Sequence, residues 1–521
     1  MKLARHLRKA PRQIAEDLKS RLEALPVDPA RITAIELAGP GFINFRFADA
    51  YLATALGNLL AQGDAYGRSD AHAGETAIVE YVSANPTGPL TVGHGRNAVL
   101  GDTLANLLEW LGYSVTREYY FNDAGRQMRV LGASVQARYR GLADPNEGTK
   151  EIEAAGGQKI TVPASFPDDG YQGDYITDIA QTVFDEHGDA LLDAEDETPF
   201  KKAAEKAIFA EIERTLLRMG VKMDTFFNEH TLYTSNKVWE VVDGLREKGL
   251  AYDKEGAVWF KTTEFGKDKD TVLVKSTGEP TYRLPDIAYH IDKFKRGFSK
   301  IIDVFGADHI ATYPDVMSGV EVFGHNTDLV DVIIYQFVTL VRGGAPVKMS
   351  TRKATYVTLD ELMDEAGEDV TRFFFLMRSP NTHLEFDLDL AKEAAEKNPV
   401  FYLQYAHARI CSILRKAEET GFTFAGDPDL TLLQHDAEAA LIKELLAFPE
   451  TIRQAADARE PHRLINYLNG VATLFTRFYG HCRIIGEDAA LAAARMALAG
   501  AARLVLRNGL TILGISAPER M

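Results

Sequence analysis

Hydrophobic and polar positions along the chain change period several times, and each period predicts a different kind of element. Apolar residues recur at helical spacing over about 3–24 and 50–62, and between them Gly41–Phe47 alternates apolar and polar residues as a half-buried strand does. The stretch 63–74, rich in Gly, Ala and Asp, is typical of a linker. We therefore predict a small, separate α/β domain over residues 1–75.

A strand, a loop, a helix and a second strand follow this linker. In order, these are the β-rich run Ala77–Val82, the Pro/Gly loop Asn85–Gly95, the helical pattern Arg96–Trp110 and the strand Ser114–Phe121. This order is how a doubly wound, Rossmann-like parallel sheet begins. The sequence therefore predicts an α/β fold for the part of the chain that follows the linker.

The predicted α/β domain covers residues 76–385 and contains an insertion at about 135–220. A segment rich in Gly, Asp and Pro breaks the pattern over 142–175, and helical sequence follows it. The α/β sequence then resumes with three β-rich runs, Ala257–Phe260, Val272–Val274 and Ile301–Phe305.

The last part of the chain has helical spacing almost throughout. Thr358-Leu-Asp-Glu361 has the form of a capping box, in which an N-cap Thr and a Glu three residues later open a helix. From about 386 to the end, apolar positions follow helical spacing, with Arg residues spread among them. We predict an all-α domain over 386–521.

Composition narrows the class of protein. Of the 521 residues, 46% are hydrophobic and 26% are charged, which is ordinary for a soluble globular protein. No apolar run approaches the length of a membrane span, and the basic N-terminus lacks the apolar core of a signal peptide. We therefore expect a cytoplasmic protein with no membrane partner.

Cysteine content and net charge exclude further classes. Cys411 and Cys482 are too few for a disulfide framework and form no Cys-x-x-Cys motif, so we expect two buried thiols and no zinc or other dedicated metal site. The net charge of −17 argues against a nonspecific nucleic-acid binder, which usually has a basic surface. It leaves open a local basic face on an acidic body.

A histidine between two glycines, Gly93-His94-Gly95, stands between the first strand and the helical pattern. Phosphate binding needs close backbone N–H groups, hence small residues, and a helix N-terminus adds favourable partial charge. A histidine at this place can donate to a phosphoryl oxygen as charge builds in a transition state. The alternative is a tight turn with a satisfied histidine.

A second candidate loop is Lys348-Met-Ser-Thr-Arg352, which follows Gly343-Gly344. Lys348 and Arg352 are suited to hold the outer phosphates of ATP, and a cationic loop can stabilise a leaving pyrophosphate. The alternative is a solvated charged loop.

These two loops, in this order within one parallel α/β domain, resemble the class I aminoacyl-tRNA synthetases, and within that class the arginyl-tRNA synthetase family. The similarity runs in family order over nearly the whole chain. It rests on Val79–Arg96, Tyr120–Gln127, Tyr282–Tyr289, Val304–His309, Lys348–Arg352, Phe401–Cys411 and Ala517–Met521. The Tyr-Leu-Gln-Tyr sequence and the terminal Pro-Glu-Arg-Met are specific to this family.

The resemblance implies a fold and a function. The fold is a class I catalytic domain, with an N-terminal domain that contacts tRNA and a C-terminal anticodon-binding bundle. The function is activation of L-arginine with ATP and Mg²⁺ to arginyl-adenylate, then transfer to the 3′ end of tRNA-Arg by a monomer that needs tRNA for activation. Two alternatives remain, a catalytically weak or idle tRNA-binding paralogue and another adenylylating enzyme of the nucleotidyl-transferase superfamily.

The resemblance also assigns site residues. The catalytic residues are His94, Lys348 and Arg352. The ATP-binding residues are Gly93, His94, Gly95, Asn97, Asp308, His309, Lys348, Met349 and Ser350. The arginine-binding residues are Glu80, Ser83, Asn85, Tyr282 and Asp286. The tRNA-binding residues are Tyr402, Tyr405, Arg409 and Met521, with Arg453, Arg463, Arg477 and Arg507 as candidate phosphate contacts.

The chemistry of arginine supports the two carboxylates in this set. The substrate guanidinium is planar, permanently charged and rich in donors, so carboxylates that pair with it give both energy and selectivity. Glu80 ends the first predicted strand, and Asp286 follows Pro285. From the residues alone, Asp286 is more typical of a charge at a helix N-terminus.

The sequence departs from the family pattern at two places. Thr91 stands where the family carries its first histidine, and Thr351 stands where it carries the second lysine of the Lys-Met-Ser loop. Some members have a compensating lysine in the first loop, where this chain has Gly88. We therefore expect Lys348, with Arg352 or Lys353, to supply the charge that meets the outer phosphates.

Overall fold

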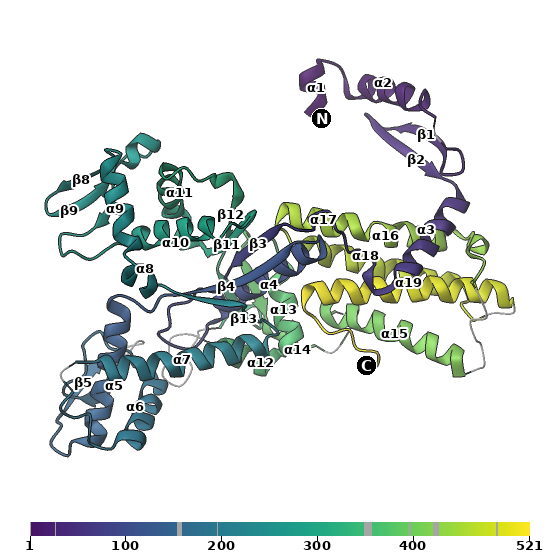
Figure 1. The fold of residues 1–521 in the computed structure, drawn as a ribbon. Helices are drawn as coiled ribbons and strands as arrows, with labels where there is room; N and C mark the ends of the chain where they lie inside the picture. Colours follow the sequence, from purple (N-terminus) through teal and green to yellow (C-terminus); the bar gives the residue numbers. More distant parts are fainter. Residues whose placement is uncertain are drawn as a thin grey trace.

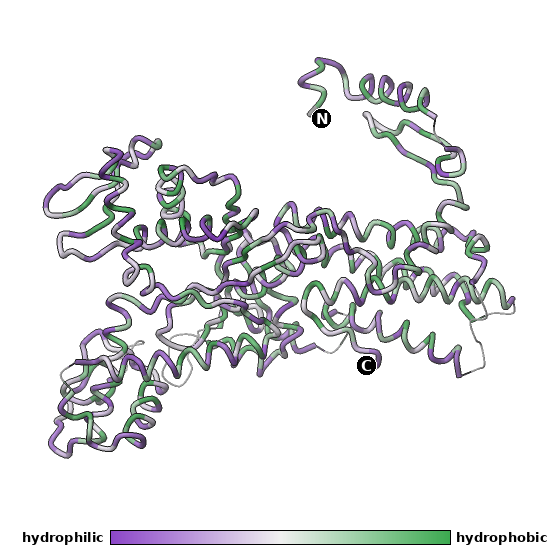
Figure 2. Tube along the Cα trace, in the orientation of Figure 1, coloured by the Kyte–Doolittle hydropathy of each residue, from purple (hydrophilic) through white to green (hydrophobic). Residues whose placement is uncertain are grey.

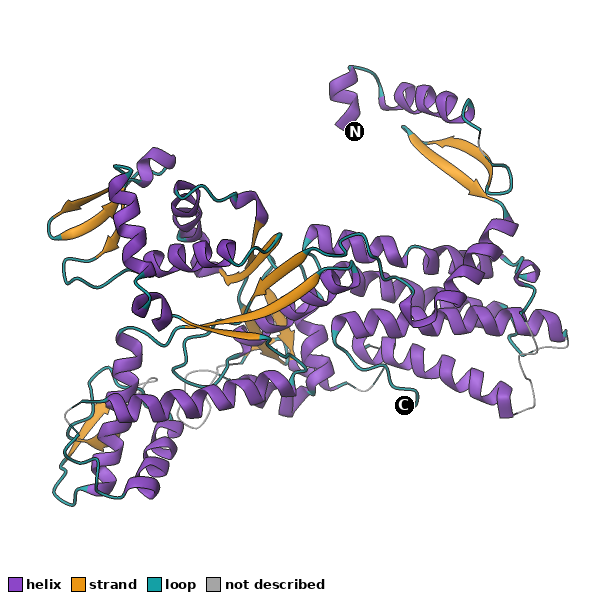
Figure 3. Cartoon of the chain, viewed as in Figure 1, coloured by secondary structure: helices purple, strands orange, loops and turns teal. Residues whose placement is uncertain are grey.

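A five-stranded parallel sheet lies at the centre of the computed structural model (Figures 1 and 3). The structure describes residues 2–26, 28–153, 159–194, 196–347, 357–393, 395, 397–419, 427–485 and 488–521. The strands run in the order β12 (Val330–Tyr335), β11 (Lys300–Gly306), β3 (Thr76–Glu80), β4 (Ser114–Phe121), β7 (Thr225–Asn228), and every neighbouring pair is parallel. The predicted doubly wound sheet is confirmed.

The order of the strands reverses between β3 and β11. From β3 the chain builds outward through β4 to β7, and it then returns to the other side of β3 to add β11 and β12. In doubly wound sheets, ligands bind at this switch point, outside the carboxyl ends of the strands. The segments that follow β3 and β11 are therefore the first place to look for a site.

Helix α4 (Val92–Trp110) begins four residues earlier than the sequence pattern predicted. The predicted loop extended to Gly95, but Val92, Gly93 and His94 form the first helical turn. The reason is the N-cap at Thr91, where the side chain three residues later, His94, bonds back to the cap. This His plays the part that Glu or Gln plays in an ordinary capping box, so the usual sequence signature is absent.

A first insertion lies between β4 and β7, at the lower left of Figure 1. It comprises α5 (Arg126–Ala143), the antiparallel hairpin of β5 (Thr149–Glu153) and β6 (Lys159–Pro163), α6 (Asp174–His187) and α7 (Thr198–Arg218). Helices α6 and α7 both pack on α5. The hairpin lies in the segment rich in Gly, Asp and Pro, for which the sequence indicated no strand.

A second group of elements lies between β7 and β11. It contains α8 (His230–Thr234), α9 (Lys237–Glu247) and a sheet of β8 (Ala251–Lys254), β9 (Ala257–Phe260) and β10 (Thr271–Val274). This sheet is antiparallel and separate from the central one, in the order β10-β9-β8. Two of the three predicted β-rich runs therefore lie outside the parallel sheet, because a short apolar run does not specify its partner strand.

Helix α10 (Arg283–Lys295) leads into β11, and α11 (Tyr313–Val322) leads from β11 towards β12. The domain is completed by β13 (Val338–Arg342), β14 (Ala345–Pro346), α12 (Leu359–Ala366), α13 (Glu368–Leu376), β15 (Leu384–Asp387) and α14 (Leu388–Lys392). Short 3₁₀ turns occur at Gly63–Ala65, Thr262–Phe265, Ala307–Ala311, Thr327–Leu329 and Leu430–Leu432. The predicted capping box before α12 is confirmed, since the Thr358 side chain accepts from the Glu361 N–H.

The N-terminal unit stands away from the rest of the molecule (Figure 1). It contains α1 (Lys2–Leu7), α2 (Pro11–Glu23) and the antiparallel pair β1 (Ile32–Ala38) and β2 (Phe42–Phe47). The next helix, α3 (Asp49–Gln62), packs on helices α16 and α19 of the C-terminal bundle. The division of the chain at residues 75 and 385 stays a prediction.

The C-terminal bundle consists of α15 (Pro399–Glu419), α16 (Asp436–Leu446), α17 (Phe448–Ala458), α18 (His462–His481) and α19 (Ala489–Leu513). Hydrophobic and hydrophilic residues alternate along these helices, as amphipathic packing requires (Figure 2). Cys411 and Cys482 are free and buried there, as predicted.

Helix α19 is long and apolar enough to cross a membrane, so the expectation that no apolar run approaches this length was too broad. Its apolar residues pack instead on α15, α16 and α18 as the core of the bundle. A central core helix is apolar on most sides, which is why α19 has the length and composition of a membrane-spanning helix.

Candidate active site

A cavity of about 500 Å³ lies at the switch point of the central sheet. It brings together predicted residues from four separate segments of the chain. These are Glu80, Ser83, Asn85, His94, Asn97, Tyr282, Asp286, Asp308 and His309. Segments more than 200 residues apart in sequence therefore converge on one cavity, at the place where the fold predicts a ligand.

His94 enters this cavity as a neutral hydrogen-bond donor. The Thr91 backbone N–H donates to Nδ1 of His94 over 3.1 Å, which makes Nδ1 an acceptor and leaves the proton on Nε2. Burial lowers the pKa of His94 to about 4, so the ring is uncharged near neutral pH. The first turn of α4 thus presents one N–H donor to the cavity without a full positive charge.

The backbone is strained where β3 ends beside the cavity. Val82 has φ 67° and Ser83 has φ 42°, which a β-branched residue such as Val82 rarely adopts. Asn97 supports this turn, because its Oδ1 accepts from the Val82 N–H over 2.8 Å and its Nδ2 donates to the Val304 carbonyl over 2.9 Å. One side chain therefore ties the ends of β3 and β11 together at the switch point.

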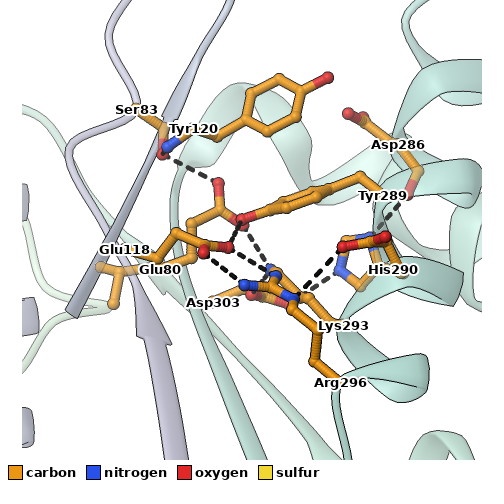
Figure 4. Close-up of polar contacts among 12 residues, drawn as sticks. Glu80, Ser83, Glu118, Tyr120, Asp286, Tyr289, His290, Lys293, Arg296 and Asp303 are labelled. Carbon is orange, nitrogen blue, oxygen red and sulfur yellow. Dashed lines mark hydrogen bonds and ion pairs between the residues drawn. The ribbon is translucent and has the colours of Figure 1, made fainter. Parts of the chain in front are cut away.

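Glu80 is part of a buried network of charges beneath the cavity (Figure 4). Lys293 lies 2.6 Å from both Glu80 Oε2 and Asp303 Oδ1, and Ser83 Oγ donates to Glu80 Oε1 over 2.9 Å. Charge–charge contact with Lys293 and His290 outweighs burial and lowers the pKa of Asp303. Both oxygens of Glu80 are occupied, so its charge is neutralised within the protein.

His290 completes this network from the next turn of α10. Its Nδ1 lies 2.8 Å from the Asp286 carbonyl and its Nε2 lies 2.9 Å from Asp303 Oδ2 (Figure 4). Both partners carry acceptor oxygens, so both ring nitrogens are within hydrogen-bond distance of an acceptor. With Lys293 between the two carboxylates, the network forms a bonded floor beneath the cavity.

Asp286 and Glu229 are different from Glu80, since neither forms an ion pair with any residue that the structure describes. Burial raises the pKa of Asp286 to about 7, and the neighbouring Glu229 adds to this shift. Burial likewise raises the pKa of Glu229 to about 7. Two uncompensated carboxyl groups at one end of a cavity form a site for a cation.

Aromatic side chains enclose this acidic end. The Tyr120 hydroxyl donates to Glu229 Oε2 over 2.9 Å, and its ring lies 4.5 Å from the Tyr289 ring. Tyr289 donates in turn to Glu118, which Arg296 holds with both guanidinium nitrogens (Figure 4). Exposed Tyr282 lies at the rim. The aromatic wall keeps water away from the carboxyl groups, which is the origin of their raised pKa values.

The other end of the cavity follows β11. His309 stacks on Phe305 with ring centroids 5.0 Å apart, and its Nε2 lies 3.8 Å from Asp308 Oδ2. His309 and Asp308 are both open to solvent. This end offers a flat, polar and solvent-accessible surface. It is suited to a ligand group that is larger and more polar than one held at the enclosed acidic end.

Some predicted site residues lie elsewhere. Gly93 and Gly95 are not among the lining residues, and Gly95 packs so closely on α12 and α13 that an added Cβ would lie 2.5 Å from Leu359. The predicted site residues of the second candidate loop lie outside the described part of the chain, namely Lys348, Met349, Ser350 and Arg352, as does the neighbouring candidate Lys353.

The predicted tRNA-contacting residues lie on the bundle. Tyr405 and Met521 are exposed, and the Arg409 guanidinium lies 4.4 Å from the ring of exposed Tyr479. The Tyr402 hydroxyl lies 3.5 Å from Thr473 Oγ1 on α18. Of the four candidate phosphate contacts, Arg453, Arg463 and Arg507 already pair with carboxylates, whereas Arg477 forms no ion pair with a described residue.

Two functional candidates were missed from the sequence, Glu229 and Lys293. Glu229 directly follows β7, and Glu80 is the last residue of β3, so an acidic residue at the end of a β-rich run was the available signal. Lys293 lies within α10, where a lysine is ordinarily solvated, and nothing local marks it as buried.

Comparison with known proteins agrees with this arrangement. Three family models match the chain. They are the arginyl tRNA synthetase N terminal domain over 1–47, the catalytic domain of tRNA synthetases class I (R) over 55–383 and the DALR anticodon binding domain over 403–521. An arginine–tRNA ligase from Salinibacter ruber is 63% identical over all of this chain and 92% of its own length.

A second ligase and a solved structure extend the comparison. The arginine–tRNA ligase from Desulfotalea psychrophila is 51% identical over 96% of this chain and 88% of its own length. The structure of Thermus thermophilus arginyl-tRNA synthetase covers 100% of this chain and 93% of its own, with a TM-score of 0.76 and 22% identity. At that identity the likeness supports the fold.

Proposed function

Because the chain belongs to the arginyl-tRNA synthetase family of class I synthetases, we propose that the cavity at the switch point is where it joins arginine to ATP. Its activity is that of an arginine–tRNA ligase, which activates L-arginine with ATP and charges tRNA with it. The proposal concerns which residues perform this reaction.

Asp286 and Glu229 bind the substrate guanidinium. The observation that carries this assignment is that both are enclosed carboxyl groups without a cationic partner among the described residues, whereas Glu80 already has Lys293. A fork of five donors can satisfy several oxygen atoms at once, and an ammonium cannot. A lysine substrate would leave carboxylate oxygens unpaired, which gives the site its selectivity.

The groups at the centre of the cavity hold the reacting atoms. We assign Asn85, which is exposed after the strained turn, to the amino-acid backbone, and Asp308 and His309 to the nucleotide, because all three line the cavity. Ser83 orients Glu80 and also accepts from the Tyr120 N–H over 3.1 Å, so it acts as a positioning residue.

The reaction requires no protein nucleophile. The arginine carboxylate attacks the α-phosphorus of ATP, and the bond to pyrophosphate breaks on the opposite side. His94 donates its Nε2–H to a phosphoryl oxygen whose charge increases in the transition state, which lowers the barrier through hydrogen bonding rather than proton transfer. The tRNA ribose hydroxyl then attacks the arginyl-adenylate carbonyl carbon, and AMP leaves.

Further cations would complete the phosphate site. We propose Lys348 with Arg352 for the outer phosphates, and Mg²⁺ that arrives with ATP and neutralises phosphate charge. Among the described residues, no group of three or more Asp, Glu, His or Cys side chains could hold a metal ion, and we propose that the ion keeps phosphate and water ligands. We also propose that the protein acts as a cytoplasmic monomer and needs bound tRNA before it activates arginine.

One assay tests the function. ATP–pyrophosphate exchange is measured with each amino acid, with and without cognate tRNA. We expect exchange with arginine only, and only with tRNA present. Absence of arginine-dependent exchange with tRNA would favour an idle paralogue, and exchange with another acid would favour a different adenylylating enzyme. Asp286→Ala should lose arginine affinity and keep ATP affinity.

A further inference from the structure

A second cavity of about 500 Å³ lies beside the one already described. Asn122 and Glu229 line the arginine cavity, whereas their sequence neighbours Asp123 and His230 line the second one. Two short loops, after β4 and β7, therefore separate the two cavities. The second cavity opens on the side of the sheet where α7 packs.

Three lysines of α7 line this second cavity, Lys201, Lys202 and Lys206. None of their ammonium groups forms an ion pair or hydrogen bond with a residue in the described ranges. Burial raises the pKa of Glu205, the one carboxyl group that lies among them on α7. In a chain of net charge −17, an unpaired cluster of three cations is a local basic site.

His230 adds a fourth donor. Its Nδ1 pairs with buried Asp123, which also accepts from the His230 backbone N–H and from Asn228 Nδ2, each over 2.9 Å. A carboxylate that holds one nitrogen of an imidazole fixes the direction of the other. The ring is 54% exposed, so Nε2 is available to a ligand.

Aromatic rings form the apolar part of the cavity. Phe209 and Phe226 meet edge to face with centroids 4.6 Å apart, and both rings are half-buried. Phe209 also meets the fully buried Phe121 edge to face. Rigid, partly open aromatic faces next to unpaired cations are the combination that binds single-stranded nucleic acid, with bases on the rings and phosphates on the cations.

We propose that this cavity binds a nucleotide of the single-stranded 3′ segment of tRNA, one or two positions before the terminal adenosine. The proposal rests on the function above, in which that adenosine enters the arginine cavity. The preceding nucleotides must then cross its rim, and the loops at residues 122–123 and 229–230 form part of the rim. Phosphate lies on Lys202, Lys206 and His230, and the base lies on Phe209.

The test compares two RNA probes, a tRNA-Arg transcript and the same transcript shortened by its last three nucleotides. Dissociation constants are measured over a range of salt concentrations for the wild type and for Lys202→Ala/Lys206→Ala. A matched control is Lys222→Ala, an exposed lysine just before the opposite end of β7 that has no ion pair within the described residues. Lys202→Arg/Lys206→Arg retains the charge.

We expect the double alanine variant to bind the full transcript about tenfold more weakly. The slope of log affinity against log salt concentration should fall in magnitude by about 1.4, since each phosphate contact to a single strand contributes about 0.7. The shortened transcript should bind equally to variant and wild type. The arginine pair and Lys222→Ala should behave as wild type. Phe209→Leu should weaken binding of the full transcript without a change in salt slope.

Three outcomes would overturn the proposal. Equal affinity of wild type and double variant for the full transcript would exclude an RNA contact. Equal losses with both transcripts would place the contact outside the 3′ segment. A raised KM for ATP with unchanged RNA affinity would assign the cavity to a free nucleotide. Arginine exchange by the wild type is measured on the same preparation, so failure of the proposed function is recognised separately.

Discussion

The backbone N–H of Thr91 donates to Nδ1 of His94 over 3.1 Å, and this contact fixes what the histidine can do. It places the ring proton on Nε2, on the side of the cavity, while burial lowers the pKa of the ring to about 4. By the resemblance described above, Thr91 stands at the position of the first histidine of the family's motif. The main-chain N–H of Thr91 orients the His94 ring, and every residue except proline has such an N–H.

The first prediction concerns this donor. His94→Ala should lower kcat for arginine-dependent exchange by about 10²–10³, because loss of one preorganised donor to a phosphoryl oxygen has an effect of this size. The KM for arginine should change little. Thr91→Ala is the control, since it keeps the N–H and should retain most activity. A large loss in Thr91→Ala with none in His94→Ala would contradict the assignment.

The second prediction concerns pH. Asp286 and Glu229 have pKa values raised to about 7, so both are largely neutral below pH 7 and ionised above it. A guanidinium binds only the ionised forms, so the KM for arginine should rise as pH falls. The rise should be up to about tenfold for each of the two groups per pH unit below 7. The KM for ATP, measured in parallel between pH 6 and 8, should follow a flatter profile.

A variant separates this effect from folding. Asp286→Asn should raise the KM for arginine at all pH values and flatten its pH dependence. Above pH 7 it should not lower Tm, because it removes an uncompensated buried charge rather than a bonded one. If the KM of Asp286→Asn for arginine depends on pH as steeply as that of the wild type, another group controls arginine binding.

The third prediction concerns Lys293, which is fully buried between Glu80 and Asp303. Lys293→Met should destabilise the protein by about 3–5 kcal/mol, because removal of one member of a buried ion network leaves its partners uncompensated. Lys300→Met is the control, since Lys300 pairs with Asp331 at a partly open site and should cost less than about 1 kcal/mol. Urea unfolding followed by circular dichroism measures both.

The fourth prediction concerns the contact between the catalytic domain and the bundle. Buried Arg372 donates to the Leu513 carbonyl over 3.1 Å, and Gly514 follows with φ +68°, where an added Cβ would lie 2.1 Å from the guanidinium. Gly514→Ala should lower stability by at least about 1–3 kcal/mol. Gly500→Ala, in the open middle of α19, should be neutral or stabilising. Equal Tm values for the two variants would refute this account.

Several elements follow from short stretches of sequence alone. The strand Ser114–Phe121 was predicted with its observed bounds, because its β-rich run ends at turn residues on both sides. The capping box before α12 was predicted because Thr358 and Glu361 are local to one another. The start of α4 was not, since its cap uses a histidine in place of the expected acidic residue.

The sequence by itself determined most of the kinds of element, the family and nine of the residues that line the cavity, because each of these depends on neighbours along the chain or on short motifs. Only the tertiary structure decided the state of the carboxyl groups. Glu80 and Lys293 are 213 residues apart and yet 2.6 Å apart in space, so Glu80 is neutralised. Asp286 has no such partner among the described residues and remains free for a substrate cation. Desolvation and pairing depend on distances across the fold, which no local pattern encodes.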